Sequence, residues 1–293
     1  MEPYYNNELG ELYHDDASDV INHLISSGRT VQTVFADPPY NIGKADWDKF
    51  EDEEYLDWTV EWIDSIGDLV NKDGSAFVMG FSEILADVKY RISRECDWID
   101  SISWLVWHYR NKPQMGNGGW TRSHESVLWL RKSDDFKFEM DRVRIPYNSH
   151  TEKYPMRDQG QSSLFGSEDG FTWDPNLEGA KPRDVIDVPT VNNASKERTE
   201  HPTQKPEELL RKFVWATTDK EQTVFDPFGG SGSTFAVCEQ LGRRWIGSEK
   251  EEEYCEMIEK RLEGFDNRND PSYWMKHDLD RREHRRKVRY GKD

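Results

Sequence analysis

Strand-like and helix-like segments alternate along this 293-residue chain, and this alternation constrains the fold more than any other feature. The strand-like runs, short and apolar, are 12–14, 31–36, 74–80, 98–109, 126–130, 222–225 and 244–247. The helix-like segments, with apolar residues at helical spacing, are 17–26, 53–70, 82–94 (with Ser82 as N-cap), 206–217, 233–241 and 251–262. Such alternation predicts an α/β domain with a mostly parallel sheet and helices on both faces.

The charge of the chain bears on its partners. A formal net charge of −18 disfavours nucleic acid on its own, because phosphate contacts need Lys and Arg. Residues 281–293 reverse the balance locally, with seven basic side chains against two acidic ones. An acidic protein can therefore still present a basic surface to DNA. The acidity also fits a salt-rich cytoplasm, in which self-repulsion is screened, so a halophilic source is a hypothesis and we expect activity to persist near molar salt.

Other features of the composition indicate a cytoplasmic protein. No apolar run reaches membrane-spanning length, and the first ten residues are acidic and polar, unlike a signal peptide. The three cysteines, Cys96, Cys238 and Cys255, are odd in number and lack metal-ligand spacing. We expect them to be reduced core thiols, with no metal site and no membrane association.

Asp37-Pro38-Pro39-Tyr40 ends the strand-like run 31–36 with an acid, two prolines and an aromatic ring. The prolines remove two backbone donors and fix the chain, so a carboxylate and a carbonyl point rigidly outward beside the ring. Two acceptors next to a flat ring suit the exocyclic amino group of a planar base. Taken alone, the segment is equally explained as a proline-rich turn after a strand.

A glycine-rich turn at 226–234 lies between a predicted strand and a predicted helix, where α/β proteins bind nucleotides. It is not a P-loop, since no Lys follows the glycines, and Phe235 stands where a dinucleotide fingerprint needs a third glycine. Glu249, at the end of the next strand, can accept both hydroxyls of a ribose. These features indicate a nucleoside without phosphates, and S-adenosylmethionine fits. A tight turn and a helix-terminal charge are the alternative explanations.

The segment 201–206 (HPTQKP) precedes a predicted helix. Free backbone donors at a helix start, together with Thr203 and Lys205, predict an anion site for a ligand carboxylate. Capping of the helix by Thr203 is the simpler alternative.

Taken together, these motifs closely resemble those of the β-class DNA amino-methyltransferases, the DPPY-type family that methylates adenine N6 or cytosine N4. The DPPY segment, followed by Asn41, precedes the glycine turn by about 190 residues, which is a circularly permuted order. Segment 122–129 resembles the strand and turn that flank the family's target pocket. Segment 12–17 resembles its strand ending in an acid that meets the cofactor adenine; Asp16 is the counterpart, although Asp15 replaces the usual Gly.

The resemblance, which covers about 11–132 and 185–263, implies an α/β, Rossmann-like class I S-adenosylmethionine-dependent methyltransferase with a mostly parallel mixed sheet. It divides the chain into a catalytic half, 1–131, an inserted target-recognition region, 132–200, a cofactor-binding half, 201–264, and a charged, basic C-terminal tail, 265–293. The insertion is rich in Gly, Pro, Ser and charge and lacks sustained periodicity.

The resemblance also implies roles for individual residues. The expected catalytic residues are Asp37, Pro38, Pro39 and Tyr40. The expected cofactor-binding residues are Asp16, Ala17, Asp37, His201, Thr203, Lys205, Asp226, Phe228, Gly230, Ser231, Gly232 and Glu249. The expected DNA-binding residues are Asn41, Arg110, Lys112 and Arg122. Arg110 and Lys112 follow a predicted strand near the proposed pocket, although for each basic residue a solvated surface charge is the simpler explanation. For the basic tail, DNA and the acidic surface of the protein itself are the alternative partners.

The implied activity is methyl transfer from S-adenosylmethionine to adenine N6 in double-stranded DNA after base flipping. Asp at the first motif position usually accompanies adenine in the resembling family, and Ser accompanies cytosine, so N4-cytosine methylation is the alternative. RNA methylation is a further alternative, whereas protein amide methyltransferases carry Asn in place of Asp37. A non-catalytic DNA-binding protein is disfavoured by the complete motif set. A homodimer and a cognate restriction endonuclease are candidate partners.

Overall fold

The structure, a computed structural model, describes residues 1–41, 51–111, 119–147, 149–153, 157–159, 171–173, 175–176 and 178–264. Lys112 and the basic tail therefore lie outside the described residues. The described residues fall into two compact units, 1–138 with 184–264 and 139–183. All the motif residues named above that the structure describes belong to the first unit.

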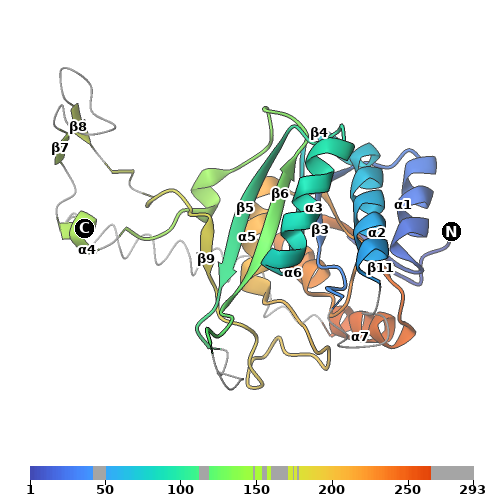
Figure 1. Cartoon of the computed structure of the whole chain (residues 1–293). Helices are drawn as coiled ribbons and strands as arrows, with labels where there is room; N and C mark the ends of the chain where they lie inside the picture. The colour runs from blue at the N-terminus through green and yellow to red at the C-terminus, as the bar shows by residue number, and fades with distance from the viewer. Residues whose placement is uncertain are drawn as a thin grey trace. The chain divides into compact units, whose positions relative to one another are not determined.

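The first unit is built on a mixed sheet, in which nine strands of the described chain pair in the order β1-β2-β11-β10-β3-β4-β6-β5-β9 (Figure 1). The strands are β1 (Tyr5–Asn6), β2 (Gly10–His14), β3 (Val31–Ala36), β4 (Val70–Gly80), β5 (Ser101–His108), β6 (His124–Arg131), β9 (Val185–Asp187), β10 (Thr223–Asp226) and β11 (Arg244–Glu249). The strands from β2 to β4 run parallel, as do β5 and β9. Because β6 is antiparallel to β4 and β5, and β1 to β2, the sheet is mixed but mostly parallel, as predicted.

Helices cover both faces of this sheet (Figure 1). One core is formed by α1 (Ala17–Ser26), α2 (Asp52–Ser65) and α3 (Ser82–Glu95), which bury Leu24, Ile63 and Val88. The other is formed by α5 (Glu207–Thr217), α6 (Ser233–Leu241) and α7 (Glu252–Glu263). A strand covered on both faces is apolar throughout, and every residue of β3 is buried.

Several local predictions differ from the structure. The strand expected over 74–80 begins at Val70, and the strand expected over 98–109 covers only Ser101–His108. The helix expected over 53–70 ends at Ser65, and a 3-10 turn (Ile66–Asp68) leads directly into β4. Ile66 and Leu69 are buried in the same core as α2, so the apolar spacing continues past the end of the helix and does not mark it. Ser82 does not cap α3, because Phe81 holds the N-cap position and the Ser82 hydroxyl lies 3.0 Å from that of Ser126.

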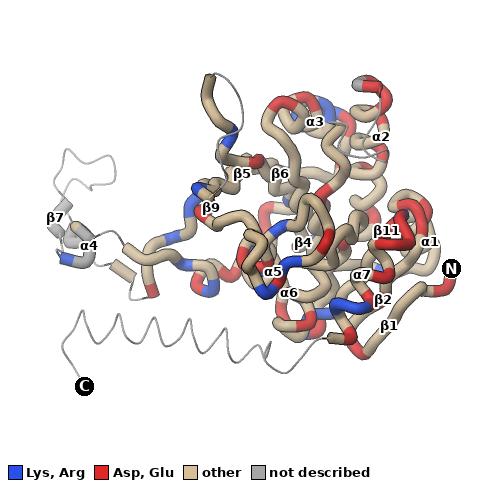
Figure 2. Tube along the Cα trace, turned by 90° about the horizontal axis from the view of Figure 1, so that it is seen from below, with Lys and Arg blue, Asp and Glu red and all other residues tan. Residues whose placement is uncertain are grey.

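The cysteine prediction is confirmed, since all three thiols are buried and unpaired. None of the described helices combines the length and apolar character needed to cross a bilayer. Acidic residues are prominent on α2, which carries six Asp or Glu residues and no Lys or Arg (Figure 2).

The second unit consists of short elements. Its described parts include a 3-10 turn (Met140–Val143), α4 (Ser149–Lys153) and the antiparallel pair β7 (Arg157–Gln159) and β8 (Phe171–Trp173). The predicted insertion, 132–200, is not confined to this unit, because β9 pairs with β5 of the main sheet. Its role in target recognition stays a prediction.

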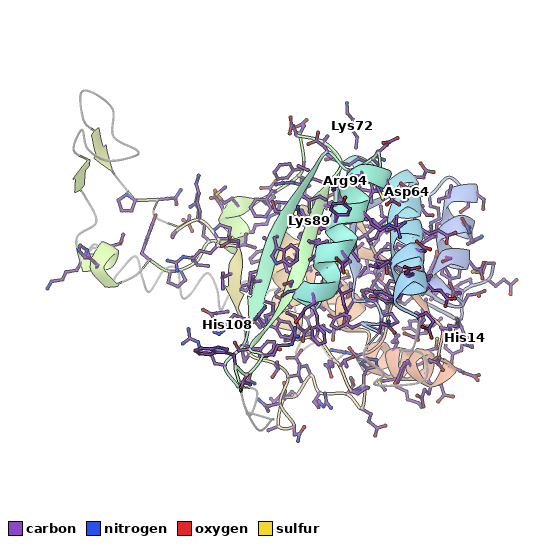
Figure 3. All side chains as sticks on the ribbon, in the orientation of Figure 1. His14, Asp64, Lys72, Lys89, Arg94 and His108 are labelled. Carbon is purple, nitrogen blue, oxygen red and sulfur yellow. The ribbon has the colours of Figure 1, made fainter. Side chains whose placement is uncertain are left out.

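The sheet topology brings the distant motifs together. β3 and β10 are parallel neighbours, with Val34 opposite Phe225, so the segments that follow them emerge at the same edge. His14, which ends β2, and His108, which ends β5, mark this edge, whereas Lys72 lies at the opposite one (Figure 3). In open α/β sheets, ligands bind beyond the carboxyl ends of the strands.

Candidate active site

A cavity of about 770 Å³ opens at this edge of the sheet. It is lined by the β2–α1 junction, the DPPY turn, residues 198 and 201–205, the glycine turn and the β11–α7 junction. Its volume is in the range of small-molecule sites. Segments from both halves of the permuted chain therefore share one cavity.

The glycine turn approaches the cavity through Gly230. This residue has a φ of +50°, in the left-handed region, and a Cβ added to it would lie 3.3 Å from Cε1 and Nε2 of His201. Its N–H donates to Oε2 of Glu249 at 2.7 Å, and the N–H of Glu251 donates to Oε1 at 2.9 Å. Glu249 thereby links the glycine turn to the start of α7, and burial raises the pKa of its carboxyl.

Asp226 and Gly232 organise the turn from behind. Asp226 accepts hydrogen bonds from the Phe228 N–H at 3.0 Å and the Thr234 hydroxyl at 2.5 Å, and burial raises its pKa to about 8. Gly232 is the N-cap of α6, and its missing Cβ makes room for Ile258. Asp226 lines the cavity, whereas Gly232 is not among the lining residues, so its contact differs from the expected one. Both residues shape the turn because a left-handed bend must be held in place before it can approach a ligand.

An aromatic wall lies beside the turn. The ring of Phe228 packs against Trp62 and Trp58 at centroid distances of 5.3 and 5.7 Å. Trp58 and Phe228 both line the cavity. Such a wall suits a purine ring, which buries well against aromatic faces.

The β2–α1 junction closes another side of the cavity with Asp16 and Ala17. Asp16 caps α1 by accepting the Ser18 N–H at 3.0 Å, and its other carboxylate oxygen lies 3.2 Å from Nζ of Lys250. The N–H of Asp15 donates to the Glu249 carbonyl at 3.1 Å, which joins this junction to the end of β11. Helix capping therefore fixes the carboxylate that the resemblance assigns to the cofactor adenine.

His201 is buried against the glycine turn and is neutral at physiological pH. Burial lowers its pKa to about 4, and its ring packs edge-on to Tyr254 at 4.6 Å. The Thr203 N–H donates to Nδ1 at 3.4 Å, so the ring proton lies on Nε2, toward Gly230. His201 therefore contributes an uncharged ring to the cavity wall and no positive charge.

Lys205 lies elsewhere than expected. The first N–H of α5, on Glu207, donates to Glu197 at 2.8 Å, so this donor of the proposed carboxylate site is already engaged. Nζ of Lys205 donates to Oδ2 of Asp37 at 2.6 Å. The position of Lys205 before a helix does not predict this partner. Asp37 follows β3, and it is the order of the strands that brings it beside Lys205.

The DPPY turn contributes to a buried polar cluster of Asp37, Tyr40, Glu125 and Lys205. The Tyr40 hydroxyl is 2.7 Å from Asp37 Oδ1 and 3.1 Å from Glu125 Oε2, and Lys205 Nζ is 3.6 Å from the same Glu125 oxygen. Asp37 and Glu125 raise the pKa of Lys205 in spite of its burial, so the lysine is charged. The Tyr55 hydroxyl donates to the Pro39 carbonyl at 2.7 Å and fixes the turn.

The expected DNA-binding residues are only partly placed. Asn41 has a φ of +55°, and Arg110 is exposed and 3.6 Å from Asp187. Arg122 forms a bidentate pair with Glu83, at 2.8 and 3.2 Å, and covers the ring of Phe81. Its guanidinium thus connects the segment before β6 to α3. DNA contact by these residues stays a prediction.

Comparison with known proteins agrees with this geometry. A family model described as DNA methylase, of the N6/N4 methyltransferases, matches residues 31–260. The chain belongs to this family. It is an S-adenosylmethionine-dependent DNA methyltransferase.

Several relatives share most of the methyltransferase's length. Type II methyltransferase M.BglII of Bacillus subtilis is 30% identical, over 89% of this chain and 71% of its own. Type II methyltransferase M1.MboII of Moraxella bovis is 29% identical, over 84% and 94%. DNA adenine methyltransferase YhdJ of Escherichia coli (strain K12) is 29% identical, over 88% and 84%.

Solved structures share the fold. The PvuII DNA methyltransferase (cytosine-N4-specific) matches with a TM-score of 0.64 and 18% identity, over 91% of this chain and 90% of its own. The M1.HpyAVI–SAM complex matches with a TM-score of 0.58 and 22% identity, over 87% and 99%.

Sequence reasoning missed several residues of the methyltransferase's cavity, among them Trp58, Glu125 and Tyr254. Trp58 and Tyr254 belong to helices whose apolar spacing explains them as packing residues. Glu125 stands in the segment that resembles the flank of a target pocket, and that position was the available signal.

Proposed function

We propose that this methyltransferase acts on adenine N6 in double-stranded DNA, after the base has been flipped out of the duplex. The observation that carries the proposal is the Asp37 carboxylate of a DPPY turn, in the same cavity as the glycine turn and Glu249. The relative named as a DNA adenine methyltransferase supports adenine as the target. A base stacked in a duplex cannot reach such a cavity, which is why flipping is part of the proposal.

The residues around the cavity fit S-adenosylmethionine. Glu249 would hold the ribose, Asp16 and Ala17 the adenine amine, and Phe228 with Trp58 the adenine ring. Gly230 lets the backbone come close, because it carries no side chain. When bound, S-adenosylmethionine supplies a methyl group on a positively charged sulfur, and the electron pair of the sulfur–methyl bond stays with the sulfur when the methyl group is transferred.

Asp37 and Pro38 would position the target amine. An exocyclic amine conjugated with a base is a weak nucleophile, so its hydrogens must be held for its lone pair to face the methyl group. The Asp37 carboxylate would accept one N–H and the Pro38 carbonyl the other, with positioning as the main contribution. After the methyl group is transferred, the amine nitrogen is positively charged and must lose one proton to give the neutral product. The Asp37 carboxylate would accept this proton. Tyr40 would stack on the flipped base.

The test is methyl transfer with a labelled donor to duplex DNA, RNA and protein in parallel, followed by mass spectrometry of the nucleosides. We expect N6-methyladenine in DNA. If the product is N4-methylcytosine, the target base is cytosine and not adenine. Transfer only to RNA or protein would refute the proposal. Asp37→Ala should lose at least about 100-fold in rate, as expected for a lost positioning group. Because it also removes the counter-ion of the buried Lys205, thermal unfolding of the variant is the control that it is folded at the assay temperature.

The remaining roles follow from the same assignment. We propose that residues 132–200 recognise the DNA sequence and that Asn41, Arg110, Lys112, Arg122 and the basic tail contact the duplex. Cytoplasmic location, a homodimer and a cognate restriction endonuclease belong to this proposal. Methylation-sensitive sequencing of DNA from expressing cells would report base, position and context together, and truncation at Leu279 would test the tail through salt-dependent DNA binding.

A further inference from the structure

Lys205 contacts both groups that the proposed function assigns to the target base, Asp37 and Tyr40. Its ammonium donates to Asp37 Oδ2 at 2.6 Å, and it also lies over the Tyr40 ring, 5.1 Å from the centroid. The other Asp37 oxygen accepts the Tyr40 hydroxyl at 2.7 Å. Both carboxylate oxygens are therefore engaged, and the ring that would stack on the base is only 9% exposed. A target base must therefore compete with Lys205 for the Asp37 carboxylate and for the face of the Tyr40 ring.

A buried ammonium cannot simply leave a carboxylate. The side chain of Lys205 is 8% exposed, and removing its counter-ion would leave an unpaired charge away from water. Glu125 is the second carboxylate beside it among the described residues, 12% exposed and 3.6 Å from Nζ. The Tyr40 hydroxyl already contacts this carboxylate at 3.1 Å. A small shift of Nζ would thus keep the ammonium paired.

We propose that Lys205 guards the target-base subsite and that Glu125 is the positioning residue that receives its ammonium when the amine binds Asp37. This rests on the proposed function of Asp37. With Lys205 held by Glu125, one oxygen of Asp37 becomes available to the N–H of the base, and the Tyr40 ring becomes available for stacking. Two carboxylates and one ammonium keep the cluster negative, which favours the positive charge that the amine nitrogen acquires on methylation.

The same arrangement predicts selectivity in the order of events. A base that offers no N–H to Asp37 cannot replace the contact that Lys205 gives up, so Lys205 stays on Asp37. A correctly placed amine replaces the lost contact, so the subsite opens only for a group that can donate to Asp37.

The test is a double-mutant cycle on Glu125→Gln and Lys205→Met, read by the single-turnover rate of methyl transfer to a duplex that carries the site found by sequencing. Calorimetry measures S-adenosylmethionine affinity, and thermal unfolding measures stability. Glu11→Gln is the matched control, because Glu11 also accepts a tyrosine hydroxyl, of Tyr13 at 2.8 Å, and pairs with a cation, Arg29 at 2.7 Å, away from the cavity.

We expect Glu125→Gln to slow single turnover by about tenfold, a coupling typical of neighbouring charged groups, with cofactor affinity unchanged. In the Lys205→Met background the same substitution should cause no further slowing, since no ammonium remains to be relocated. Glu11→Gln should lower stability less than Glu125→Gln, because its pair with Arg29 is more exposed, and it should leave the rate unchanged.

Normal turnover by Glu125→Gln, or the same slowing in both backgrounds, would overturn the inference. If Glu125→Gln fails to fold, Glu125→Asp carries the test: its shorter carboxylate should give a smaller slowing that also disappears with Lys205→Met, and a slowing that persists there refutes the coupling. If the unsubstituted enzyme methylates no DNA amine, the proposed function is refuted. If it methylates DNA and the Glu125 variants turn over at the same rate, only this inference is refuted.

Discussion

Gly230 offers the sharpest test of how the glycine turn approaches the cofactor. In Gly230→Ala, a methyl group would stand 3.3 Å from two ring atoms of His201, inside the cavity wall. The residue's φ of +50° would also place alanine in the left-handed region. Two separable costs follow, one for the backbone and one for the space that the ligand needs.

The backbone cost is about 1–2 kcal/mol for an L-residue with a Cβ. A chain of this size loses roughly 2–4 °C in Tm for each 1 kcal/mol. The second cost appears in ligand binding: a wall displaced by a few tenths of an ångström should weaken S-adenosylmethionine by about tenfold, or roughly 1.4 kcal/mol.

Gly242→Ala separates the two costs. Gly242 also has a left-handed φ, +64°, but an added Cβ there meets nothing within 4 Å. We expect both variants to lose similar stability in thermal unfolding, and calorimetry to show weakened cofactor binding only for Gly230→Ala. Equal affinity in the two variants would refute the reasoning that the turn meets the cofactor at Gly230.

Three further predictions concern charge. Glu249→Gln should weaken S-adenosylmethionine binding by at least about tenfold in calorimetry, because an amide accepts fewer hydroxyl donors than a carboxylate; unchanged affinity would remove Glu249 from the ribose site. His201, with its pKa lowered to about 4 against about 6.5 unfolded, contributes stability that is present above pH 6.5 and lost as the pH falls toward 4, by about 3 kcal/mol in total. In urea unfolding, the free energy of unfolding of His201→Gln should fall less between pH 7 and pH 5 than that of the wild type. Activity should persist near molar salt, and unfolding there would contradict the halophilic hypothesis.

Local pattern was sufficient where packing agrees with chain propensity. Ala17–Ser26 and Ser233–Leu241 begin and end where their spacing predicts, and β3 has its predicted bounds. It was insufficient at the end of α2, where Ile66 and Leu69 continue the apolar pattern without continuing the helix. A hydrophobic pattern reports burial, and a 3-10 turn can bury the same side chains as a helix.

The sequence by itself determined the α/β class, the permuted motif order and the chemistry of each motif, because these depend on residue types and on short spacings. The tertiary structure alone decided what each motif faces. Parallel pairing of β3 with β10 brings Asp37 and the glycine turn to one edge, and antiparallel β6 adds Glu125 beside them. Lys205 therefore pairs with Asp37 instead of a helix-start ligand. The physical reason is that a buried charge takes its partner from whatever the fold places within hydrogen-bond reach, and that neighbour is set by strand order and not by distance along the chain.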